Sequence, residues 1–432
     1  MISDLITLIL IAFFVIYGMN RPHIAMCGLV WINTYKPQES SYAFMSGQPI
    51  SFLFTLFFIL VCLLNYKKVK IPSSKNYHFL SIGFMIWLTI SHFDAQFPEL
   101  ASLKFNNIIK SMLFCYLIPF VIISRKQLEQ FLWIAIISFG TFAFFGGVKS
   151  LLGGGGYGMN LIGISSTMWS EGSILTNQML SIIPIVLFLG GYSEISKKRK
   201  AFKWLAYGYA ICCVLILIGT QARSGLICLT LLILFAIWYS KQKVKIIGVA
   251  FIIPLILLPL APPEWFERMS TIQNKDTVAA ESSAMGRVVV WRWALDYFKT
   301  DPLTGGGFLS YRANAGQLGA YSKANEVLID YKNPKAYHNI LFEVTGASGV
   351  VGLAFYLSIL SYIFFTCLSM MKKYLDDNYL QFYCRATIIS MLVYCAGGMF
   401  VSYAFYPWIY YLFAATVVMK LNIVHKHEKD FK

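Results

Sequence analysis

Two short polar stretches contain the residues of this chain whose types and spacing could do chemistry. The first, residues 220–225, reads Thr-Gln-Ala-Arg-Ser-Gly and contains Arg223, and the second, residues 336–339, contains His338. Both adjoin long apolar runs, where an arginine is costly unless it reaches water or binds an anion. Between them lies Arg287. Two arginines and a histidine around one loop predict an anion site, and a phosphate group is the natural ligand.

Each of these three side chains suits a distinct role at such a site. Arg223 is predicted to begin a helix, where free backbone N–H groups and the fork of the guanidinium both suit phosphate oxygens. Arg287 falls in the first turns of a helix predicted over residues 284–298, beside Gly286. His338 begins an apolar run and could accept a proton near neutral pH. The alternatives are an arginine that snorkels to water, a solvated loop charge and an ordinary polar helix start.

Further side chains are candidates for substrate binding. Arg292 follows Arg287 by five residues, so the two do not share a helix face. Glu343 is expected to be a buried partner of another group rather than a catalytic partner of His338. The other candidates are Tyr337 beside His338, Lys110 inside a predicted span, and Lys149 on the outer side.

Several well-known site motifs are missing from the sequence. It contains no Asp-x-Asp motif, no Walker loop and no glycine pattern of a dinucleotide fold. No Cys and His residues have zinc spacing. We therefore expect no metal and no cofactor, and we expect arginines to stabilise a leaving phosphate.

The elements that must position these residues are membrane helices. The chain of 432 residues is 57% hydrophobic and 13% charged, against about 25% charged residues in soluble domains. We expect an all-α polytopic membrane protein of 12 or 13 helices, since the second span is short and could be re-entrant. The predicted spans are 2–18, 22–34, 50–65, 78–93, 106–124, 128–146, 174–191, 202–219, 223–240, 244–261, 338–370, 383–401 and 404–424.

The net charge of +16 does not indicate nucleic-acid binding, because basic clusters occur in every second loop. That alternation follows the positive-inside rule, so the clusters are predicted to be cytoplasmic and to contact membrane lipid. We expect one transmembrane domain over residues 1–432, with a large outer loop at 262–337. No cysteine falls in the long outer loops, so no disulfides are expected.

Two segments near the large loop have specific predicted shapes. The helix at 284–298 is amphipathic and is expected to lie flat at the membrane interface, anchored by its tryptophans. The apolar run from 338 to 370 would be roughly 50 Å long as a helix, against a hydrocarbon core of about 30 Å. It is therefore expected to project above the membrane or to bend near Gly346, Gly349 and Gly352.

At these residues the chain resembles the O-antigen ligase and O-oligosaccharyltransferase superfamily, which has the GT-C type of fold. It is most similar to the branch of O-glycosylation ligases associated with exosortase systems. The order and spacing of the matching segments carry the resemblance, which covers roughly residues 146–353. The segments are 146–149 with its glycine-rich continuation, 220–225, 263–272, 283–287, 305–308, 337–339 and 349–353.

The resemblance implies a metal-independent, inverting transfer of a glycan from undecaprenyl diphosphate to an acceptor hydroxyl on a protein or glycolipid. Such a protein would lie in the bacterial inner membrane with its active site facing the periplasm. By the same resemblance, Arg223 would hold the donor diphosphate, Arg287 would assist, and His338 would activate the acceptor. The chain departs from the family pattern at Asn339, where serine is common, and at residues 221–222, which leaves the acceptor open.

Two other functions stay open from the sequence. A polysaccharide polymerase of the Wzy type would use similar arginines to join repeat units to one another. A transporter of the lipid-linked glycan would instead distribute basic residues along an intramembrane cavity and would usually show an inverted repeat. No such repeat is visible here, and the basic candidates gather at one outer boundary.

Overall fold

The computed structural model describes residues 2–40, 44–153, 171–248, 252, 261, 263–270, 278–323 and 332–430. Every regular element in these ranges is a helix, which confirms the all-α prediction. The longer helices are α1 (Ile2–Gly18), α2 (Pro22–Tyr35), α4 (Ile50–Leu64), α5 (Lys75–Phe93), α6 (Pro98–Val121), α7 (Arg125–Leu151), α8 (Gly172–Tyr192), α10 (Lys200–Thr220), α11 (Arg223–Tyr239), α14 (Val278–Tyr297), α16 (Ile340–Lys373), α17 (Asn378–Gly398) and α18 (Pro407–Asp430). The shorter ones are α3 (Pro37–Ser40), η1 (Tyr66–Lys68), α9 (Glu194–Lys198), α13 (Pro263–Ser270), η3 (Ser310–Asn314) and α15 (Leu318–Lys323).

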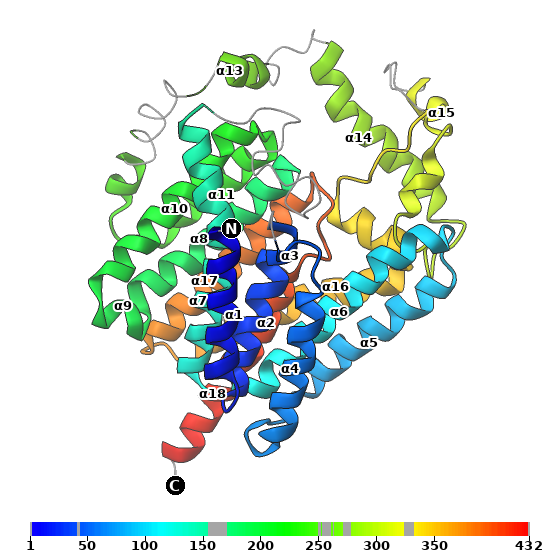
Figure 1. Ribbon diagram of the computed structural model, residues 1–432. Coiled ribbons are helices and arrows are strands. Elements are labelled where there is room, and N and C mark those ends of the chain that lie inside the picture. The colour runs from blue at the N-terminus through cyan, green and yellow to red at the C-terminus, as the bar shows by residue number, and fades with distance from the viewer. Residues whose placement is uncertain are drawn as a thin grey trace.

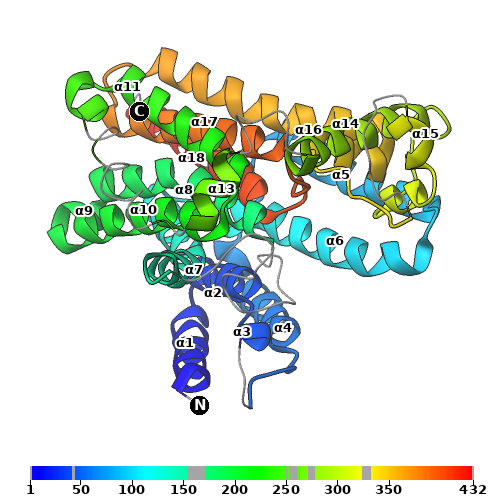
Figure 2. The ribbon, with the colours of Figure 1, turned by 90° about the horizontal axis from the view of Figure 1, so that it is seen from above.

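The core of the bundle is formed by α8, α17 and α18. Helix α8 packs against α10, α11 and α17, while α18 packs against α6, α7 and α16. Nearly every residue of α18 from 407 to 419 is buried. Seen from above, α1 and α4 project from one side, and α16 lies along the other side with α14 (Figure 2). This arrangement places the start of α16 beside α14, which carries Arg287.

Five of the described helices are long and apolar enough to cross a membrane, namely α7, α8, α10, α16 and α17. Three shorter apolar helices accompany them, at Asp4–Gly18, in α4 and in α11. The chain is thus a multi-pass membrane protein by length and composition of its helices. The total of 12 or 13 spans stays a prediction, and most of the predicted span 244–261 lies outside the described residues.

Helix α16 bends near its N-terminal end, which is one of the two alternatives that the sequence left open. Ser348 and Gly349 depart from helical geometry, and Gly349 has a φ of 63°. A Cβ atom at Gly349 would lie 1.9 Å from the carbonyl oxygen of Leu303, so the loop before η3 fits into the bend. The Nε1 of Trp87 donates to the Ser348 carbonyl oxygen at 2.8 Å and satisfies a group that the bend releases. The bend therefore separates an outer section of α16 from its longer inner section.

The tryptophans of α14 pack within the protein, against the prediction that they anchor the helix at the membrane interface. That α14 lies flat there stays a prediction. In Figure 1, α14 and α15 lie together at one end of the molecule. Val289, Val290 and Trp293 are almost fully buried and form a small second core with Leu318 and Tyr337. By contrast, Leu295 is 55% exposed. Residues 289, 290 and 293 thus define the face of α14 that the protein itself covers.

Candidate functional site at the outer helix starts

Arg223 is the first residue of α11, as predicted, and two residues separate it from the end of α10. Gln221, in that turn, has a φ of 52°, in the left-handed region that few non-glycine residues adopt. The fully buried Asn177 of α8 donates through Nδ2 to Ser224 Oγ at 3.0 Å and to the Gly397 carbonyl oxygen at 3.3 Å. These contacts fix the start of α11 against α8 and α17, and Arg223 with it.

A second contact holds the same turn from the other side. The hydroxyl groups of Thr176 and Thr220 are 2.5 Å apart, and Thr220 Oγ1 donates to the Ile216 carbonyl oxygen. A Cβ atom at Gly225 would lie 2.5 Å from Cγ2 of Thr176, so α8 and α11 approach closely there. All these contacts are between neutral groups.

His338 precedes α16 instead of opening it, which corrects the predicted helix boundary by two residues. The helix begins at Ile340, and His338 has a φ of 48°. Asn339 is the N-cap: its Oδ1 accepts from the backbone N–H groups of Leu341 at 2.8 Å and of Phe342 at 3.3 Å. Asparagine and serine cap helices about equally well, so the departure from the family's serine keeps the local geometry.

Helix α14 brings Arg287 to His338. Trp291 Nε1 donates to the Tyr337 carbonyl oxygen at 2.8 Å, and its ring stacks on Phe342 with centroids 5.7 Å apart. Arg287 lies one helical turn before Trp291, hence on the same side of α14. The sequence predicted that Arg287 lies in the first turns of this helix. Because α14 begins at Val278, Arg287 instead lies in its middle.

The surroundings of His338 favour its neutral form. Burial first, and then the positive charges of Arg287 and Lys335, together lower the pKa of His338 to about 4. Near neutral pH the imidazole is therefore unprotonated, which is the form that can accept a proton. Arg287 is therefore near enough to His338 to affect its charge, and their joint role in one site stays a prediction.

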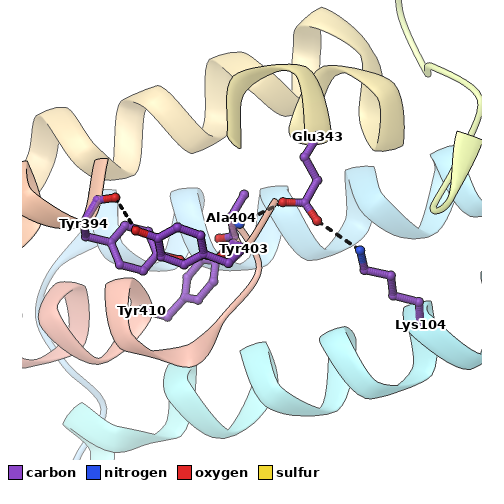
Figure 3. Close-up of polar contacts among 6 residues, drawn as sticks. All are labelled: Lys104, Glu343, Tyr394, Tyr403, Ala404 and Tyr410. Atoms are coloured by element: carbon purple, nitrogen blue, oxygen red, sulfur yellow. Dashed lines mark hydrogen bonds and ion pairs between the residues drawn. The ribbon is translucent and has the colours of Figure 1, made fainter. Parts of the chain in front are cut away.

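Glu343 lies in an ion pair at the first turn of α16 (Figure 3). Its Oε1 accepts from Lys104 Nζ at 3.0 Å, and its Oε2 accepts from the backbone N–H of Ala404 at 2.9 Å. The carboxylate thus joins α16 to α6 and to the loop between α17 and α18. Sequence reasoning missed Lys104, because residues 94–105 were predicted as a loop, whereas α6 begins at Pro98.

Glu171 is a second residue that sequence reasoning missed. It immediately precedes α8, and its carboxylate is close enough to two charged groups for Arg287 to lower its pKa and Glu343 to raise it. Its neighbour Gly172 packs on the turn before α11, since a Cβ atom there would lie 3.0 Å from Thr220 Cβ. Glu171 therefore lies between the turn that holds Arg223 and the group around Arg287 and Glu343. Because Glu171 lies between two predicted spans, its sequence surroundings did not distinguish it from an ordinary polar loop residue.

The end of α17 joins the two helix starts as well. The Gly397 carbonyl oxygen accepts from Asn177, which holds the start of α11. One residue later, Gly398 packs on Ile340, and Asn339 Nδ2 donates to the Met399 carbonyl oxygen at 3.4 Å. Residues 397–399, at the end of α17, thus contact the elements that carry Arg223 and His338.

The remaining predicted substrate-binding residues lie in varied settings. Tyr337 is 3% exposed, its hydroxyl is 3.0 Å from Ser310 Oγ, and its ring packs on Gly346, so its side chain supports the structure around His338. Arg292, Lys110 and Lys149 are all exposed, on α14, α6 and α7. Their contact with substrate stays a prediction. Among the described residues, no group of three or more His, Cys, Asp and Glu side chains could hold a metal ion.

Comparison with known proteins divides the chain into two matched regions. Residues 2–194 match a family of unknown function, DUF5935. Residues 208–357 match the O-antigen ligase family model, Wzy_C. No curated protein matches the chain. The second match contains Arg223, Arg287 and His338, and with the all-α membrane fold it agrees with lipid-linked glycan transfer as the general function. The match over residues 208–357 supports a place for this region in the O-antigen ligase superfamily.

Proposed function

We propose that this protein transfers a glycan from a polyprenyl diphosphate carrier, undecaprenyl diphosphate, to an acceptor hydroxyl group at the periplasmic face of the bacterial inner membrane. The reaction is metal-independent and inverts the configuration at the anomeric carbon. Arg223 and Arg287 bind the donor diphosphate, and His338 is the general base. The observation that carries the proposal is the proximity of Arg287 to His338, which pairs an anion-binding group with a neutral imidazole.

The proposed step balances as one displacement. The acceptor oxygen forms a bond to the anomeric carbon on the side opposite the diphosphate, and the bond from that carbon to the diphosphate oxygen breaks. The acceptor proton passes to His338, and polyprenyl diphosphate leaves with the electron pair. Charge grows on the departing oxygen, so arginines fixed beside it bind the transition state more tightly than the ground state.

Donor binding also prepares the base in this scheme. Arg287 lowers the pKa of His338 in the free protein. A bound diphosphate offsets that positive charge, so the pKa of His338 rises toward neutrality and the imidazole becomes a stronger base. Proton acceptance is therefore favoured only after the donor has bound, which protects the donor from premature chemistry.

The test is transfer by the purified protein with a polyprenyl-diphosphate sugar and a panel of acceptors, with EDTA present. Arg223→Ala and His338→Ala are each expected to lose at least about 10²-fold in activity. Arg312→Ala is the matched control, because Arg312 is exposed on η3 and belongs to no part of the proposed site. Full activity of either site variant would remove that residue from its role, and loss of wild-type activity in EDTA would refute metal independence.

The products of the same reaction separate a ligase from a Wzy-type polymerase. A ligase forms one linkage to a protein or glycolipid acceptor, whereas a polymerase extends repeat units on the carrier. Transfer to a protein acceptor would support the exosortase-associated branch. A ladder of carrier-linked repeats would instead identify a polymerase.

A further inference from the structure

A groove lies far from the outer site, between α5, α16 and the second half of α18. It encloses about 560 Å³ and is lined by the inner section of α16, together with Asn76 and Phe79 of α5 and Lys420 of α18. Helix α5 starts and α16 ends here, at Lys75 and at Lys372–Lys373. The sequence predicts that these basic ends face the cytoplasm. The groove therefore belongs to the cytoplasmic half of the protein.

One wall of the groove carries hydroxyl groups of α16. Ser358, Ser361, Thr366 and Ser369 all line the groove, in two pairs that are each three residues apart. The three serines are exposed, and none of the four hydroxyl groups makes a hydrogen bond within the described part of the chain. A hydroxyl group without a partner in hydrocarbon is costly. Such a set of hydroxyl groups on a membrane helix therefore favours a ligand that offers oxygen acceptors.

Lys420 supplies the positive charge of the groove. It is the first exposed residue after the buried run 407–419 of α18, and its ammonium lies 5.6 Å from the ring centroid of Tyr362. The Tyr362 hydroxyl is 3.3 Å from Ser74 Oγ, which holds the ring in place. Among the salt bridges of the described residues, none involves Lys420. The ammonium is thus directed at the groove and available for an anion.

Two aromatic side chains form the apolar part of the groove. Phe79 of α5 is 67% exposed and Phe365 of α16 is 65% exposed. Exposed phenylalanines beside a lysine and several hydroxyl groups match an amphiphile with an anionic head and apolar chains. Ester carbonyl oxygens of a glycerophospholipid would accept from the hydroxyl groups, whereas a polyprenyl phosphate has no ester carbonyl to offer them.

We propose that this groove is a binding site for an anionic phospholipid of the inner leaflet. Lys420 binds the phosphodiester, the hydroxyl groups of α16 bind the glycerol ester region, and the acyl chains lie against Phe79 and Phe365. Since the site involves none of the residues in the transfer reaction, it does not depend on the proposed function.

The test uses the full-length protein, stripped of lipid in a neutral detergent, and native mass spectrometry with added phosphatidylglycerol. Phosphatidylcholine, glycerol 3-phosphate and undecaprenyl phosphate are the comparison ligands. We expect selective retention of phosphatidylglycerol, and Lys420→Gln should weaken it about fivefold. A Ser361→Leu/Ser369→Leu variant, which fills the groove without changing charge, should weaken it as well.

Lys198→Gln is the matched control, because Lys198 is an exposed cytoplasmic-side lysine on α9 that does not line the groove. Circular dichroism and thermal unfolding establish that each variant is folded. Equal retention of phosphatidylcholine would overturn the proposal, as would retention of glycerol 3-phosphate alone or a preference for undecaprenyl phosphate. If both groove variants are folded and still bind phosphatidylglycerol as well as the wild type does, the lipid binds elsewhere and the proposal is wrong.

Discussion

The starts of α11 and α16 each present a proposed catalytic side chain, and they are held in different ways. A non-glycine residue with a positive φ precedes each helix, namely Gln221 before α11 and His338 before α16. Neutral amide and hydroxyl groups hold the first start, through Asn177. An ion pair of Glu343 holds the second, and a nearby arginine sets the protonation of its histidine. The position of Arg223 should therefore be insensitive to pH, whereas the behaviour of His338 depends on the charges around it.

The largest expected effect comes from the charge beside His338. Arg287→Gln should lower transfer activity about 10²-fold, because a donor to the leaving diphosphate is lost. Removal of a positive charge also raises the pKa of His338 from about 4 toward its ordinary value of 6.5. The acidic limb of the plot of log kcat/KM against pH should therefore move to higher pH. An unmoved limb in Arg287→Gln, with Arg312→Gln as control, would break the proposed coupling.

The ion pair gives the next largest effect, on stability. Glu343→Ala leaves Lys104 without its partner and the backbone N–H of Ala404 without an acceptor. The free energy of unfolding should fall by about 2 kcal/mol, measured by thermal unfolding in detergent. Lys104→Met should cost less, since Lys104 is 36% exposed and the Ala404 bond remains. Equal destabilisation by the two variants would show that Ala404 contributes nothing.

The neutral start of α11 should respond differently. Asn177→Ala removes the hydrogen bonds to Ser224 and to Gly397, so we expect a loss of about 1.5 kcal/mol in the free energy of unfolding. Activity should fall by the same factor at every pH, because no group that ionises near neutral pH is involved. A pH-dependent loss in this variant would contradict the distinction between the two helix starts.

The smallest expected effect is at the N-cap of α16. Asn339→Ser should change the free energy of unfolding by less than about 0.5 kcal/mol, since both residues cap well, whereas Asn339→Ala should cost about 1 kcal/mol. Thermal unfolding of the two variants side by side gives the comparison. If serine were as costly as alanine, the bond from Asn339 to Met399 would matter more than the cap.

Local patterns predicted the parts of the site that depend on nearby residues. Apolar runs predicted the helices, and the start of α11 at Arg223 is where the sequence placed it. The length and glycines of the run after His338 predicted, as one of two alternatives, the bend that the structure shows at Ser348 and Gly349. Helix periodicity, turn residues and glycine placement act over a few residues, so the sequence expresses them directly.

The partners within the site were decided by tertiary structure. Lys104 and Glu343 are 239 positions apart, and the charge of Arg287 acts on Glu171 from a different segment of the chain. The contacts of the buried face of α14 with Leu318 and Tyr337 were not predicted either, because an amphipathic pattern shows that a face is covered but not what covers it. The sequence determined where the helices that follow Arg223 and His338 begin, to within two residues. Only the packing of α6, α8, α14 and α17 around those helix starts decided which charges meet, because contacts between distant segments leave no periodic trace along the chain.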